Sequence, residues 1–225
     1  MNDKVKSFYK KGYSYNVTDP FFLERDQATD EQWQRLTQSQ HFCMMPWVHM
    51  HAFPDGRAYP CCLSDYWHPV GDLRTHTMEE VWNQYKYKTM RRNMLEDKPC
   101  VECKKCYEQE ENGFFSGRRS ANKHHGHHIK KLEANPFEMT YWDIRFSNLC
   151  NFKCRMCGDM LSSAWETEQK QHNMINWADP KNNWQLPEVR KAITAFQDEQ
   201  IEREFAQAVE EHRVEEVYWV GGEPL

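Results

Sequence analysis

Three cysteines within eight residues constrain this chain more than any other feature. Cys150, Cys154 and Cys157 are separated by three and then by two residues, and they follow a run of alternating apolar side chains, residues 141–147, that predicts a β-strand. A short loop with this spacing can supply three ligands to a cubic iron–sulfur cluster, one fewer than an all-cysteine cluster needs. If no other residue supplies the fourth ligand, one iron keeps a free coordination position for a group that does not come from the protein.

A second motif follows the next predicted strand. Residues 214–220 have a strand-like pattern and run directly into the sequence Gly221, Gly222, Glu223 and Pro224. With both motifs in this order, the chain resembles the radical S-adenosylmethionine (radical SAM) enzymes. That family carries CxxxCxxC after the first strand of a partial (β/α) barrel and a GGEP-type motif at the end of the second strand.

The resemblance implies a role for each residue of the two motifs. Cys150, Cys154 and Cys157 are expected to hold a catalytic [4Fe–4S] cluster, whose open iron binds the methionyl end of S-adenosylmethionine. Residues 221–224 are expected to bind that same end. An electron from the reduced cluster then cleaves the sulfonium, and the resulting 5′-deoxyadenosyl radical abstracts hydrogen from a substrate. Met156 stands where the family usually has an aromatic residue, and we expect its thioether to pack against the adenine of the cofactor.

Zinc binding is the main alternative for the cysteine motif. CxxxCxxC alone could be half of a zinc site, and Gly-Gly followed by Pro is also an ordinary turn. Zinc sites, however, usually combine two close ligands with two distant ones. Three close cysteines after one strand, with a GGEP sequence after the next, fit zinc poorly, so we favour the cluster.

Two further cysteines flank a predicted hairpin in the N-terminal half. Alternating side chains over residues 48–53 predict a strand, and residues 54–57 have the composition of a turn. A return strand then leads to Cys61. Such a β-hairpin would bring Cys43 and Cys61 to the same end.

A helix is predicted after the hairpin. Thr77 and Glu80, three residues apart, form a capping box that marks its start. Its apolar stripe, which we assign to the core, comprises Met78, Val81, Trp82 and Tyr85.

Hairpin cysteines followed by a helix and a compact cysteine cluster resemble the SPASM and twitch domains attached to many radical SAM enzymes. The resemblance implies one auxiliary [4Fe–4S] cluster, for which we prefer the ligands Cys43, Cys61, Cys103 and Cys106. Cys62 and Cys100 are adjacent alternatives that the spacing does not exclude. Structural zinc would also take four of these cysteines, and only the radical SAM context favours iron–sulfur. In known relatives this module usually follows the barrel, whereas here it comes first.

Residues 112–135 have the composition of a linker between the two cysteine-rich segments. A histidine-rich tract within it comprises His124, His125, His127 and His128. Such tracts can bind metal. We favour a solvated loop instead, because Gly126 and the flanking lysines indicate exposure.

The rest of the C-terminal segment predicts two helices and a long loop. The first helix begins at Ser162 or Ser163, and residues 172–187 form an irregular insertion. The second helix, before the second strand, is marked by Ile201, Phe205 and Val209, which are spaced by four. On the strand before the cysteine motif, the polar residues Asp143 and Arg145 are expected to face the interior of a barrel.

Composition limits the partners and the compartment. The formal net charge of the 225 residues is −5, which gives no general basic surface for nucleic acid. The N-terminus carries no apolar signal region, and no run of residues is long enough to span a membrane. Nine cysteines without a secretory signal indicate a reducing compartment and metal ligation rather than disulfides, so we expect a cytoplasmic protein.

These observations predict an α/β chain in three parts. A small cysteine-rich α+β domain of the SPASM/twitch type is expected over residues 1–111, a linker over 112–135, and the N-terminal part of a radical SAM core over 136–225. The sequence ends directly after the GGEP motif, where a barrel normally continues. We therefore expect a truncated barrel, either a fragment or one piece of a split enzyme that a second chain completes.

The resemblance implies a radical SAM oxidoreductase or maturase that acts on a peptide or a small molecule. Its electrons would come from a reductant such as a ferredoxin or a flavodoxin. The alternative is a non-catalytic iron–sulfur or zinc-binding module, or an inactive truncated piece of such an enzyme. Binding of S-adenosylmethionine to the cluster separates the two hypotheses.

Overall fold

The computed structural model describes residues 22–132, 137–145 and 147–218. In this part of the chain, strands β1 (His49–Ala52), β2 (Arg57–Tyr59), β3 (Gly71–Asp72), β4 (Tyr141–Ile144) and β5 (Glu216–Val217) form one sheet in the order β3-β2-β1-β4-β5. The first three strands pair antiparallel, whereas β1, β4 and β5 run parallel. The prediction of an α/β fold is confirmed, with a mixed sheet; the barrel stays a prediction.

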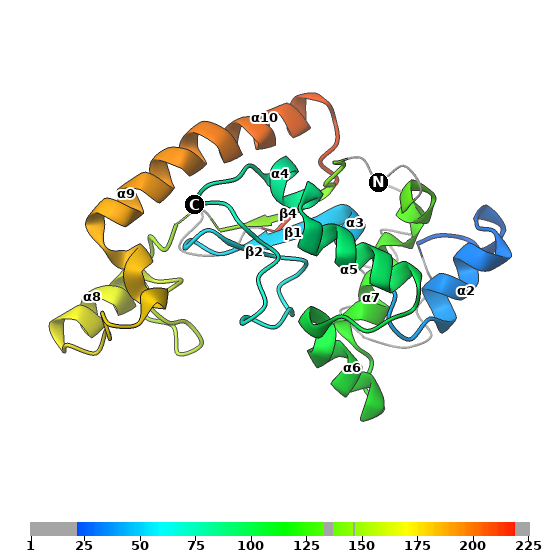
Figure 1. Ribbon diagram of the computed structural model, residues 1–225, viewed down its shortest axis with the longest axis horizontal. Coiled ribbons are helices and arrows are strands. Elements are labelled where there is room, and N and C mark those ends of the chain that lie inside the picture. The colour runs from blue at the N-terminus through cyan, green and yellow to red at the C-terminus, as the bar shows by residue number, and fades with distance from the viewer. Residues whose placement is uncertain (1–21, 133–136, 146, 219–225) are drawn as a thin grey trace.

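Helices cover this sheet and extend beyond both of its ends. The α-helices are α2 (Asp30–Gln38), α3 (Met45–Val48), α4 (Met78–Asn83), α5 (Tyr85–Leu95), α6 (Lys104–Glu111), α7 (Gly117–His125), α8 (Ser163–Gln171), α9 (Pro187–Phe196) and α10 (Glu202–Glu210). Shorter 3₁₀ turns are η1 (Arg25–Gln27), η2 (Val101–Cys103), η3 (Gly126–Leu132) and η4 (Pro180–Gln185), and η5 (Gln197–Ile201) is a π-helical turn. In Figure 1, α9 and α10 run along one side of the sheet, α8 lies at one end, and α2 and α6 lie at the other. None of the described helices is long and apolar enough to cross a membrane.

The predicted hairpin is present. His51 of β1 lies opposite Tyr59 of β2 in an antiparallel register. The turn between them requires glycine, because Gly56 has a φ of +86° and a Cβ there would lie 2.5 Å from Cγ of Arg74. The hairpin therefore fixes the spacing between the chain that precedes β1 and the chain that follows β2.

Parallel pairing of β1 with β4 joins the N-terminal and C-terminal segments. His49 pairs with Tyr141 and His51 pairs with Asp143. The opposite face of the same strands is apolar, and Trp142 packs edge-on against Phe205 of α10 with ring centroids 5.0 Å apart. One buried core runs from the N-terminal helices to α10. The boundaries of the three predicted parts stay predictions, but their strands share one sheet and one core.

The helix after the hairpin is broken where one helix was expected. Thr77 and Glu80 form the predicted capping box, and Met78, Val81 and Trp82 are buried. Gln84 has an extended ψ of 156°, so α4 ends there and α5 begins at the next residue. The break rotates the following residues, which leaves Tyr85 77% exposed. The assignment of Tyr85 to the core was therefore wrong.

The histidine-rich tract is helical rather than a solvated loop, which corrects the expectation for this part of the linker. It occupies the end of α7 and the start of η3, and both His125 and His128 are buried. Burial, together with the neighbouring histidines, lowers the pKa of His125 to about 2, so its ring is neutral at neutral pH. Sequence composition indicated exposure because lysines flank the tract, but these histidines face the sheet.

The C-terminal helices largely follow the prediction. Ser162 caps α8, and its hydroxyl accepts a hydrogen bond from Trp165 N. On the last helix the buried stripe passes through Ile201 to Ala208, and Val209 is 48% exposed. At 3.6 residues per turn, a residue seven positions after Ile201 points more nearly in the same direction than a residue eight positions after it. The helix that these residues predicted before the second strand is confirmed as α10, with Val209 at the edge of its buried stripe.

Candidate metal centre

The four preferred ligands of the N-terminal segment come together at one place. Cys43 precedes α3, Cys61 follows β2, Cys103 ends η2 and Cys106 lies in α6. In each of the six pairs that these residues make, charge on one sulfur raises the pKa of another. The hairpin thus contributes two of these thiols and the segment around η2 and α6 contributes the other two.

Burial sets the protonation of these thiols. It raises the pKa of Cys43 to about 12, and it raises the pKa values of Cys61 and Cys103 well above the ordinary range. Four neutral thiols, two of them buried and two partly buried, are a donor set suited to soft metal ions. Binding iron would release their protons and convert them to thiolates. The residues present therefore fit an iron–sulfur cluster by their chemistry.

The distances between ligand atoms can be compared with those of a single zinc site. A zinc tetrahedron with Zn–S bonds of about 2.3 Å has sulfurs about 3.8 Å apart. In the described part of the chain, both groups of three ligand atoms that lie within 4.8 Å of one another consist of histidine and glutamate. No three cysteine sulfurs there approach that closely.

The two alternative cysteines lie differently. Cys62 is exposed, and apart from burial its pKa responds mainly to Asp143 and Arg145 of the sheet. Cys100 is buried, with Sγ 3.7 Å from the backbone oxygen of Met90, and burial raises its pKa to about 12. Of the four convergent thiols, only Cys103 has a pKa that Cys100 affects. The ligand assignment stays a prediction, and this geometry supports Cys61 over Cys62 and Cys103 over Cys100.

Two polar residues of α7 hold the backbone beside Cys43. Arg118 is buried, pairs with Glu110 of α6 and donates a hydrogen bond of 2.7 Å to Phe42 O. Asn122, one turn later, accepts a hydrogen bond of 2.9 Å from Met44 N and donates one of 3.1 Å to Phe42 O. Sequence reasoning missed both residues. Their spacing of four, which places them on one face of a helix, was the available signal.

The CxxxCxxC loop is fastened to the start of α8. Cys150 N donates to Ser163 Oγ at 3.1 Å, and the same hydroxyl donates to Cys150 O at 3.0 Å. Trp165 Nε1 donates a hydrogen bond of 3.0 Å to Cys154 O. Cys157 N donates to the same oxygen, also at 3.0 Å, which closes a turn from Cys154 to Cys157. Cys154 is exposed and Cys150 and Cys157 are partly exposed. The loop therefore has a fixed backbone, and its three cysteines are accessible in the described part of the chain.

A buried carboxylate ties this loop to two helices. Glu166 Oε2 accepts hydrogen bonds from Asn148 Nδ2 at 2.6 Å and from Arg190 Nη2 at 2.9 Å, and Lys170 pairs with its other oxygen. Burial raises the pKa of Glu166, but these donors outweigh it and lower the pKa below its ordinary value. Asn148 also donates to Asp159 O on the far side of the cysteines. The carboxylate stays ionised and braces both ends of the loop.

The second motif of the radical SAM resemblance cannot be placed. Gly221, Gly222, Glu223 and Pro224 lie outside the described residues. The strand before them is described as far as β5, which pairs in parallel with β4 and opposes Glu216 to Tyr141. The two strands that precede the two motifs therefore run side by side in the same direction. Met156 is 99% exposed and contacts no partner that would fix its role.

One face of the sheet carries a buried polar pair. His51 Nδ1 lies 2.7 Å from Asp143 Oδ2, and the two side chains are 1% and 0% exposed. Burial raises the pKa of Asp143, but the bond from His51 outweighs it and lowers the pKa. Asp143 was expected to face a barrel interior; in the structure it faces the hairpin histidine. The partner His51 was not predicted, because it lies on a strand 92 residues earlier.

His49, the neighbour of this pair on β1, gives a pH-dependent prediction. Burial lowers its pKa from 6.5 to about 4, so the unfolded chain binds more protons than the folded chain between these values. Stability should therefore fall by about 2 kcal/mol from this residue between pH 7 and pH 5. The check is urea unfolding of the metal-free protein at both pH values, for wild type and His49→Gln. The stability advantage of wild type over the variant should shrink at pH 5; an unchanged difference would contradict the prediction.

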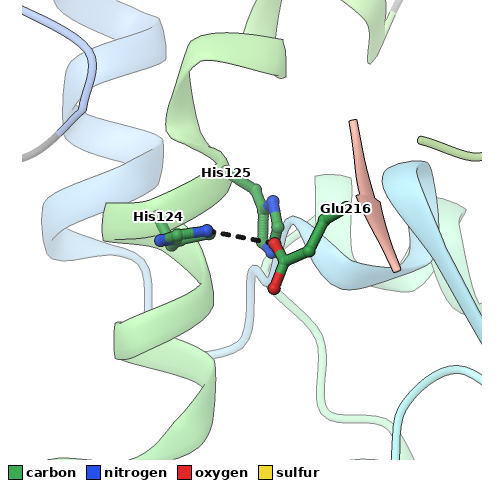
Figure 2. Close-up of side chains that lie close together, drawn as sticks. All are labelled: His124, His125 and Glu216. Carbon is green, nitrogen blue, oxygen red and sulfur yellow. Dashed lines mark hydrogen bonds and ion pairs between the residues drawn. The ribbon is translucent and has the colours of Figure 1, made fainter. Parts of the chain in front are cut away.

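The histidine tract meets the start of β5. Figure 2 shows His124 directed at Glu216, with His125 beside them. His124 Nε2 lies 3.1 Å from Glu216 Oε2, and the ring of His125 stacks on Tyr141 with centroids 5.5 Å apart. The contact between His124 and Glu216 connects the histidine tract with a strand some ninety residues later.

Comparison with known proteins identifies the N-terminal cysteine centre. Residues 43–107 match the family model of SPASM, an iron-sulfur cluster-binding domain. This part of the chain is therefore a SPASM-type iron–sulfur domain, which confirms the resemblance predicted from its cysteines. The match begins at Cys43 and extends just past Cys106, so all four preferred ligands lie within it. No curated protein and no solved structure matches the chain.

Proposed function

We propose that this chain belongs to a radical SAM enzyme with one auxiliary cluster. Cys150, Cys154 and Cys157 would hold the catalytic [4Fe–4S] cluster, and residues 221–224 would bind the methionyl end of S-adenosylmethionine. The auxiliary [4Fe–4S] cluster would be held by Cys43, Cys61, Cys103 and Cys106.

One observation carries this proposal: the SPASM-type domain and the segment that leads into the CxxxCxxC loop contribute neighbouring strands to one sheet. The SPASM match ends at residue 107, and its hairpin strand β1 pairs in parallel with β4, the strand that leads into the loop. Domains of this type accompany radical SAM cores, and the loop has the family's cysteine spacing. Because β1 and β4 are neighbours, a cluster in each site would belong to one rigid unit rather than to two tethered modules.

The protein's own residues would position the chemistry. When bound, the reduced cluster would supply the electron that cleaves S-adenosylmethionine to a 5′-deoxyadenosyl radical. Ser163 and Trp165 would keep the loop backbone in place while the three cysteines bind iron. Exposed Met156 would pack against the adenine. Glu166 would keep the loop attached to α8 and α9.

The substrate class and the partners follow by analogy with the family. SPASM-containing relatives often modify peptides, so a peptide or a small molecule is the proposed substrate. A ferredoxin or flavodoxin would supply electrons, and a second chain could complete a barrel. The alternative, a non-catalytic metal-binding module, would share the SPASM-type centre and lack any response to S-adenosylmethionine.

Anaerobic reconstitution with iron and sulfide tests the proposal. Wild type should bind about eight irons per chain and a Cys150/Cys154/Cys157→Ala variant about four, because one of two [4Fe–4S] clusters is lost. The EPR spectrum of the reduced protein should change on adding S-adenosylmethionine in wild type and stay constant in the variant. Four irons in both proteins, or spectra indifferent to the cofactor, would leave the non-catalytic module as the function.

A further inference from the structure

Three ligand atoms converge where the histidine tract meets the chain entering β5. Nε2 of His128 and Nε2 of His127 lie 2.8 Å and 3.4 Å from the same oxygen, Oε2 of Glu215. All three atoms lie within 4.8 Å of one another. We propose that His127, His128 and Glu215 bind one divalent transition-metal ion of the Zn²⁺ class, separately from the iron–sulfur centres.

The distances suit such an ion. Zinc binds histidine nitrogen at about 2.0–2.1 Å and carboxylate oxygen at about 2.0–2.2 Å, so tetrahedral ligands stand about 3.3–3.5 Å apart. The two contacts to Glu215, 3.4 Å and 2.8 Å, lie at or about half an ångström below that spacing, and the two histidine nitrogens lie within 4.8 Å of each other, so modest side-chain rotations would bring all three into range. Two histidines and one glutamate are also an established zinc donor set, and they leave a fourth position for water.

Rigid elements hold the three ligands, and solvent reaches them. His127 and His128 lie on η3 with ring centroids 4.0 Å apart. Glu215 is fixed at the edge of the sheet, because its backbone N donates to Thr140 O at 2.8 Å. His128 is 3% exposed, whereas His127 and Glu215 are 42% and 48% exposed. An ion can therefore enter from the open side and meet one anchored imidazole.

The neighbouring group, His124, His125 and Glu216, is less suited. Figure 2 shows His124 directed at the carboxylate of Glu216. His125 is buried, and its ring stacks on Tyr141. Committing that ring to a metal would disturb its packing. His124 is therefore a useful control position close to the proposed site but outside it.

A bound ion would close a long loop of the chain. The two histidines precede Glu215 by 88 and 87 residues, and Glu215 stands directly before β5. Metal binding to the folded state would hold this strand entry against η3 and raise the unfolding temperature. Without metal, the two histidines form hydrogen bonds with Glu215. If these side chains form only those hydrogen bonds and bind no metal ion, the proposal is wrong.

Zinc binding to the iron-reconstituted protein tests the site. Zinc is added by equilibrium dialysis, and its X-ray absorption fine structure reports neighbours at about 2.0–2.1 Å for nitrogen and oxygen or about 2.3 Å for sulfur. We expect nitrogen and oxygen neighbours and a higher unfolding temperature in wild type. His127→Ala and Glu215→Gln, both at exposed positions, should weaken binding by about 100-fold or more, exceeding the loss typical of outer-shell residues.

The control is His124→Ala, which should bind zinc as wild type does. Glu215→Gln also guards against a folding artefact, because it keeps the size of a half-exposed side chain. Zinc with only sulfur neighbours would overturn the proposal. So would zinc that both ligand variants retain, or a loss that is as large in His124→Ala as in His127→Ala.

Discussion

Cys61→Ala is expected to lose about four irons per reconstituted chain, the content of one [4Fe–4S] cluster, and Cys62→Ala to lose none. The two cysteines are adjacent in sequence, yet only Cys61 shares its surroundings with Cys43, Cys103 and Cys106. Cys62 is exposed and lies closer to the polar residues of β4. Iron and sulfide analysis after anaerobic reconstitution measures the difference.

The pair Cys103 and Cys100 provides the matched control at the other end of the centre. Cys103→Ala should remove the same irons, whereas Cys100→Ala should keep them, because Cys100 contacts the backbone of Met90 instead. Equal losses in both members of either pair would contradict the geometry. A loss confined to Cys62 or Cys100 would reverse the assignment.

Glu166→Ala is expected to destabilise the protein by about 1–3 kcal/mol, because it removes a buried carboxylate and leaves Arg190 and the buried amide of Asn148 without their acceptor. Asn148 precedes Cys150 by two residues, so loosening it should also lower iron binding by the CxxxCxxC loop. Urea unfolding of the metal-free protein reports the stability. Iron content after reconstitution reports the loop.

Glu168→Ala is the matched control on the same helix. Glu168 pairs with Lys153 of the same loop, but both side chains are exposed, and ion pairs at the surface contribute little. The unfolding midpoint of this variant should stay close to that of wild type, with its iron content intact. If the two variants behave alike, burial of Glu166 does not brace the loop.

The local elements of the fold could be predicted from short stretches of sequence. The hairpin depends on alternation and on a turn at Gly56, and the starts of α4 and α8 depend on Thr77 and Ser162 as caps. Each of these signals acts over a few residues, so the sequence displays it directly. The same holds for the spacing of Cys150, Cys154 and Cys157.

The errors arise where a local pattern meets a tertiary contact. Tyr85 continues the apolar stripe of its helix, but a backbone break at Gln84 turns it outward. The histidine tract has the composition of an exposed loop, yet it packs on the sheet and contacts Glu215 and Glu216. Pairing of residues about ninety positions apart leaves no trace in composition or periodicity.

By itself, the sequence determined two cysteine motifs in this protein: a CxxxCxxC spacing after one predicted strand, and a hairpin and helix that carry the cysteines of a SPASM-type domain. Only the tertiary structure decided which members of the adjacent cysteine pairs converge, and that β1 and β4 join both segments in one sheet. The physical reason is that spacing along the chain fixes which ligands are available. The direction of each side chain depends on strand register and packing between distant segments.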